Sequence, residues 1–137
     1  MRLALVLFTL SAVGCGNVMY RYDQTTASTA LAAMACRDAL SEAVDKKVAA
    51  CAEKLKTEGT KAAQACLDTW HAQYDKINTG CMALKLGAQS ALASREVIEA
   101  AASKNKDALG WIARLAKLAV DVIAAFSEAG LKFGGVK

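Results

Sequence analysis

Cysteine offers the most chemistry of any residue type in this chain of 137 residues, which contains five of them. Cys36, Cys51, Cys66 and Cys81 follow one another at intervals of 15 residues, and Cys15 precedes them. A thiol can form a disulfide, bind a metal or attack an electrophile, and the redox state of its compartment decides which of these happens. The first question is therefore where the chain resides.

The N-terminal residues have the layout of an export signal. Met1-Arg2 is a short positive region, and Leu3 to Leu10 is a purely apolar stretch that is too short to span a bilayer permanently. Directly after it comes Ser11-Ala12-Val13-Gly14-Cys15. This run resembles the lipobox of bacterial and phage lipoproteins, in which small residues precede a cysteine. Ala12 departs from the leucine usual at that place, and the resemblance covers the signal alone.

The lipobox resemblance implies cleavage before Cys15, whose thiol then carries lipid and anchors the mature chain to a membrane. Gly16, in place of Asp, implies the outer membrane, facing the periplasm, in a Gram-negative cell. The alternative is an ordinary secretory signal followed by a coincidental cysteine. Both interpretations place the mature chain outside the cytoplasm, where disulfides form.

The four later cysteines are then expected in disulfides before metal sites. Fifteen residues of helix advance about 22 Å, so neighbouring cysteines cannot bond within one helix. A turn is indicated at residues 57–60, because Gly59 can take a left-handed conformation and Thr60 can cap a following helix. The midpoint of the cysteine pattern coincides with this turn. The register predicts an antiparallel helical hairpin with two nested bridges, Cys36 to Cys81 and Cys51 to Cys66.

Apolar side chains recur at helical spacing along both predicted arms. In the first arm the stripe contains Cys36, Leu40, Val44, Val48, Cys51 and Leu55. In the second it contains Cys66, Trp70, Tyr74, Ile77, Cys81, Leu84 and Ala88. The cysteines fall on both stripes, as the hairpin requires. Intermolecular disulfides in a dimer and a zinc site of four thiolates are the alternatives, and zinc is disfavoured because structural sites usually take two ligands from one tight turn.

Composition indicates an all-α fold. The chain is 55% hydrophobic, contains no proline and is rich in alanine, whereas β-branched residues are scattered singly. The net charge of +4 is spread among interspersed acids and bases, so no nucleic-acid surface is expected. A bend is expected at Asn78-Thr79-Gly80, and the second helix is expected to end near Ser103.

A third helix is predicted from about Ala108 to Ala129, with Asp107 as its cap and Gly130 ending it. Its apolar residues between 109 and 126 cover most of its circumference and leave a narrow polar strip: Arg114, Lys117, Asp121 and Glu128. We expect this helix to fold onto the hairpin as a three-helix bundle. Self-association or binding to an envelope protein, and contact with the membrane, are alternatives.

No enzymatic motif is found, and no cofactor, metal site or catalytic residue is expected. The only histidine, His71, has no evident nucleophile or paired acid nearby in the sequence. Trp70 and Tyr74, at helical spacing, are expected in the core rather than in a ligand pocket.

The expected organisation is a signal peptide (1–14), a lipidated N-terminus and polar tether (15–26), the stapled hairpin (27–104) and the C-terminal helix (107–130). The predicted function is a structural or interaction role in the cell envelope. The layout is also similar to that of unimolecular spanins, phage lysis proteins that join two membranes; a phage exclusion lipoprotein and a small periplasmic ligand binder are further alternatives.

Overall fold

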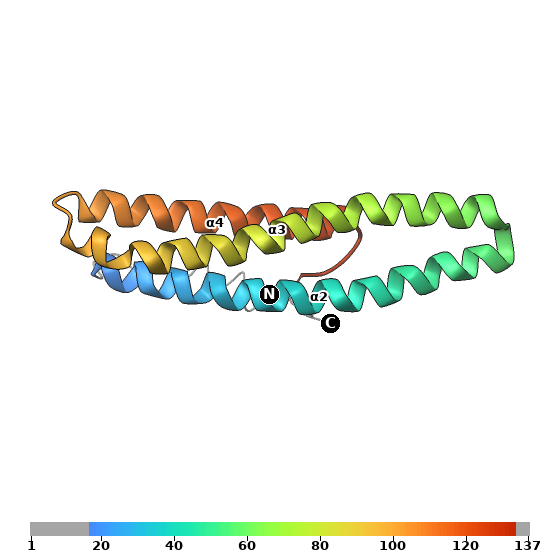
Figure 1. The fold of residues 1–137 in the computed structure, drawn as a ribbon, viewed down its shortest axis with the longest axis horizontal. Helices are drawn as coiled ribbons and strands as arrows, with labels where there is room; N and C mark the ends of the chain where they lie inside the picture. Colours follow the sequence, from blue (N-terminus) through green and yellow to red (C-terminus); the bar gives the residue numbers. More distant parts are fainter. Residues whose placement is uncertain (1–16, 134–137) are drawn as a thin grey trace.

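The computed structural model describes residues 17–133 and contains three helices in that range. They are α2 (Val18–Glu58), α3 (Thr60–Ala100) and α4 (Lys104–Glu128). The first two are the antiparallel arms of one long hairpin, and α4 runs back along it (Figure 1). Each helix contacts both others. The predicted all-α hairpin with a third C-terminal helix is confirmed.

The hairpin turn consists of a single residue, Gly59. Its φ of 92° and ψ of −179° are accessible to glycine and strained for other residues. Its N–H donates to the carbonyl of Lys54 at 3.2 Å, which satisfies one of the last carbonyls of α2. The predicted position of the turn is confirmed. Thr60 as a cap is wrong, because Thr60 is already the first residue of α3 and Gly59 is the cap.

The first arm starts earlier than predicted, since α2 begins at Val18 and residues 18–26 are helical. Asn17 caps the helix, its Oδ1 accepting the N–H of Met19 at 2.9 Å. Buried residues then recur every three or four positions, through Met19, Tyr22, Thr26, Thr29, Ala33, Cys36, Leu40 and Ala43. The predicted tether is therefore wrong from residue 18 onward: its polar residues conceal a buried stripe that continues the helix.

Two glycines of α3 allow α4 to approach closely. A Cβ built at Gly80 would lie 2.6 Å from Cγ2 of Val122, and one at Gly87 would lie 2.8 Å from Cδ1 of Leu118. The segment around Gly80 is helical throughout. Gly80 is a position of close packing between α3 and α4.

The third helix covers only part of the hairpin. α4 has 25 residues against 41 in each arm, or about 38 Å against about 62 Å of helix. Near its C-terminus Lys47 donates to the carbonyl of Ala129 at 3.0 Å, and Lys76 pairs with Glu128. The turn of the hairpin projects beyond this point (Figure 1).

The start of α4 also differs slightly from the prediction. It begins at Lys104 after Ser103, and Asp107 lies in its first turn, where it accepts a hydrogen bond from the Ser103 hydroxyl at 2.7 Å. Asp107 as the cap is therefore wrong. An acidic residue in the first turn still favours the helix through its dipole.

Beyond α4, residues 48–69 form what we call the bare end of the hairpin. Val48 is 46% exposed and Leu55 is 51% exposed, although both belong to the predicted buried stripe. These two positions were predicted wrongly, because no third helix reaches them. Within the bare end only Cys51 and Ala63 are buried.

Candidate interaction surface

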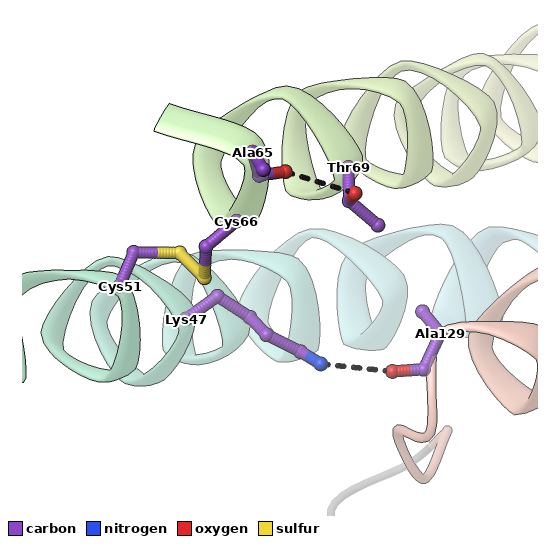
Figure 2. The surroundings of a disulfide bond; sticks show 6 residues. All are labelled: Lys47, Cys51, Ala65, Cys66, Thr69 and Ala129. Carbon is purple, nitrogen blue, oxygen red and sulfur yellow. Dashed lines mark hydrogen bonds between the residues drawn. A yellow bond between two sulfur atoms is a disulfide. The ribbon is translucent and has the colours of Figure 1, made fainter. Parts of the chain in front are cut away.

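The two predicted disulfides join the arms at two levels. Cys36 bonds Cys81 with a Cα–Cα distance of 5.6 Å, and Cys51 bonds Cys66 with a Cα–Cα distance of 5.5 Å. The nested pairing is confirmed, and both bridges lie within one chain. Figure 2 shows the Cys51–Cys66 bridge beside Lys47, whose ammonium reaches the end of α4.

Cys15, the predicted lipid attachment residue, lies outside the described residues, as do the signal peptide and Gly16. Asn17, the first residue described, follows Cys15 by two positions.

His71 is exposed, and its nearest acidic partner is Asp75 at 3.8 Å, one turn away on the same helix. Trp70 is 6% exposed and meets Tyr74 edge-to-face at a centroid distance of 6.1 Å. Both aromatic residues pack in the main core cluster, as expected from their spacing. Within residues 17–133, no three His, Cys, Asp or Glu side chains are grouped so that they could hold a metal ion.

An open groove of about 900 Å³ lies between the two hairpin arms and is lined by residues of α2 and α3. We call it the α2–α3 groove. Small alanine side chains form part of its lining and leave space between the arms: Ala27, Ala30, Ala33 and Ala88. Larger apolar side chains also line it: Met34, Met82 and Leu92. On α3 it lies opposite the glycines that face α4, since residues 80 and 82 differ by about 200° around a helix. The hairpin therefore packs α4 on one face and leaves a second groove open on the other.

A charged pair limits the groove at the end nearest the chain start. Arg95 donates to both carboxylate oxygens of Asp23, at 2.7 and 2.8 Å, and also to Glu99 at 2.7 Å. This bidentate hydrogen bonding lowers the pKa of Asp23 and raises that of Arg95. Beside them, Tyr22 donates its hydroxyl to the carbonyl of Ala91, and burial raises the pKa of that phenol.

The other half of the groove carries two cations, Arg37 on α2 and Lys85 on α3. In the described part of the chain neither makes an ion pair. The residues one turn before and after each of them are all uncharged. The charge at this part of the groove is therefore positive and uncompensated.

The groove was not predicted from the sequence. One apolar stripe was assigned to each arm, whereas Ala27, Ala30 and Met34 form a second stripe beside the first. The available signal was the recurrence of small residues with methionine and leucine at helical spacing, on a part of the chain interpreted as tether and surface. Alanine gives little hydrophobic contrast, so this second face was not recognised.

The C-terminal helix, which was expected to fold onto the hairpin as a three-helix bundle, packs one face against both α2 and α3. Leu115, Val122 and Phe126 are at most 1% exposed, while Leu109 and Val120 remain exposed. Of the helices described, none contains a segment that is both long enough and apolar enough to cross a membrane.

Comparisons of the chain with known protein families, with curated proteins and with solved structures find no match.

Proposed function

We propose that this protein is a lipoprotein, anchored through Cys15 to an extracytoplasmic membrane surface, whose helical bundle has an interaction role in the cell envelope. In a Gram-negative cell the proposed site is the outer membrane, facing the periplasm. The observation that carries the anchoring is the junction between the lipobox-like run and the bundle.

The bundle begins two positions after Cys15, because Asn17 caps α2. Cleavage before Cys15 would remove only residues that precede the described bundle, so every packed residue would stay in place. The two residue steps from Cys15 to Asn17 span at most about 7 Å, which would hold this end of the bundle at the membrane surface.

The two disulfides support an oxidising compartment. Both bridges join residues far apart in the sequence, at separations of 45 and 15 residues. Bridges of this structural kind persist outside the cytoplasm and are rare within it.

An interaction role is supported by the open α2–α3 groove and by the exposed apolar side chains beside it. The alternative of a unimolecular spanin would require a second membrane anchor in the C-terminal segment. The large apolar side chains Leu115, Val122 and Phe126 instead pack against the hairpin, which favours the envelope lipoprotein.

The test is the intact mass of the native protein extracted from its membrane. We expect the chain to begin at Cys15, to carry acyl groups there and to contain no free thiol. A Cys15→Ser variant should leave the membrane fraction while retaining its helical circular dichroism. A native chain that keeps Met1 and has unmodified thiols would contradict the proposal.

A further inference from the structure

The α2–α3 groove has apolar residues arranged in pairs on both of its sides. In the register set by the disulfides, residues that face each other across the hairpin have position numbers that add up to 117. The position numbers of Leu31 and Leu86 add up to 117, and those of Met34 and Met82 add up to 116. All four are exposed, between 45% and 65%. The two arms thus present matched apolar ridges that flank an alanine-lined floor.

This arrangement fits a helix better than a small amphiphile. The leucines Leu31 and Leu86 do not line the groove but lie beside it, about 40° around their helices from the lining residues Ala27 and Met82. A single acyl chain in the groove would leave both leucines in water. A helix laid along the groove would cover them, as in other helix-in-groove complexes.

The dimensions agree with a helix of moderate length. On α2 the groove extends from Tyr22 to Arg37, which corresponds to about 22 Å of helix. An occupant of about 15 residues would therefore match it. With α4 on the opposite face, such an occupant would add a fourth helix around the same two arms.

The uncompensated cations define the charge of the occupant. Lys85 lies opposite Ala32, five positions along α2 from Arg37, so the two cations are separated by about 7.5 Å along the groove. Carboxylates one turn apart on a helix are separated by about 6 Å along its axis and can approach both. The complementary helix is thus acidic on its flanks and apolar on the face that it buries.

A second copy of this chain fits less well. Lys85 lies near the middle of the α3 side of the groove, whose lining extends from Asn78 to Arg95. Two grooves paired about a twofold axis through their centres would bring the two Lys85 side chains together, and like charges disfavour such a contact.

We propose that the α2–α3 groove binds an acidic amphipathic helix of a partner protein. This inference names the kind of partner for the proposed function and rests on its interaction role. It does not rest on the lipid anchor. The mass measurement at Cys15 and the binding experiment below can therefore fail independently of each other.

The experiment selects binders from a displayed library of 18-residue amphipathic helical peptides on the immobilised full chain. The apolar stripe of the peptides is constant, and their flanking positions vary among Glu, Gln and Lys. We expect enrichment of peptides with two Glu residues about one turn apart. Their affinity should fall about tenfold or more for the Arg37→Glu, Lys85→Glu double variant, since two attractions become repulsions.

The matched control is the Lys61→Glu, Lys132→Glu double variant, which changes the net charge equally at exposed positions outside the groove. It should bind the selected peptides like the parent chain. Peptides with Lys at the two selected positions should bind the Arg37→Glu, Lys85→Glu variant better than they bind the parent.

Three outcomes would overturn the proposal. The first is selection without a preference for Glu, or binding that is unaffected by the groove variant. The second is binding of palmitate in the groove with no peptide selected, which would identify a small amphiphile as the occupant. The third is a dimer of the full chain in sedimentation that the groove variant dissociates, which would identify a second copy.

Discussion

Around Phe126 three helices meet, whereas around Cys51 only two do. In the first region large apolar side chains are fully buried, among them Phe126, Leu84 and Ile77, each 0% exposed. In the bare end, residues 48–69, leucine and valine side chains lie at the surface and a disulfide joins the arms near the turn. The comparison indicates that the Cys51–Cys66 bridge replaces the third helix where α4 ends.

The largest difference between the regions is expected for truncation of a large apolar side chain. Phe126→Ala should lower the free energy of unfolding by about 3 to 5 kcal/mol, because a fully buried ring is removed. Leu55→Ala, in the bare end, should change it by about 0.5 kcal/mol or less. Denaturant unfolding of both variants with the disulfides intact measures this. Similar losses would mean that the bare end has a core of its own.

Removal of the inner bridge should have the next largest effect. The Cys51→Ala, Cys66→Ala double variant opens a loop of 15 residues, for which the chain-entropy estimate is about 3 kcal/mol. The expected loss can be followed by thermal unfolding at constant protein concentration. If the variant loses less than about 1 kcal/mol, helix packing and not the bridge holds the bare end together.

A substitution at the close contact between α3 and α4 should lower the free energy of unfolding by a smaller amount. Gly80→Ala should cost about 1 to 3 kcal/mol, because the new methyl group would collide with Val122, a stiff side chain that is 1% exposed. Gly110→Ala is the control: nothing lies within 4 Å of its added Cβ, and alanine should stabilise the helix by about 0.5 to 1 kcal/mol. Equal effects in unfolding experiments would exclude close packing at Gly80.

The smallest effect is expected for the ion pair at the chain start. Arg95 holds the pKa of Asp23 below its unfolded value of about 3.9, so the pair stabilises the fold above that pH. The contribution is lost as the pH falls through the lower folded-state pKa. Because the Asp23 side chain is 42% exposed, Asp23→Asn should cost at most about 1 kcal/mol at pH 7, and the cost should shrink as the pH falls through the lowered pKa of Asp23. A cost that does not change with pH would assign the effect to packing.

The hairpin could be predicted from the sequence because two independent signals coincide. The position of Gly59 indicated a turn, and the spacing of the four cysteines indicated the same midpoint. Each disulfide then fixed the register of the arms, since a slip of even one turn would separate its sulfur atoms. The local chemistry of the turn and the long-range geometry of the bridges therefore specify the same hairpin.

The prediction was wrong where burial depends on a partner helix whose length was unknown. Val48 and Leu55 match the helical period, but α4 ends before it reaches them. Conversely, Tyr22 and Asp23 resemble a polar tether, yet one is buried and the other is paired with Arg95 across the hairpin. The groove was missed for a related reason: which face of an alanine-rich helix stays open depends on where α4 packs.

Residue-resolved native hydrogen exchange on the Cys51→Ala, Cys66→Ala variant tests most directly whether the bridge replaces the third helix. We predict that amides of residues 48–69 lose most of their protection, while those of residues 77–98, which α4 supports, keep theirs. Equal loss of protection along both arms would contradict the account, since it would show that the hairpin unfolds as one unit that α4 does not divide.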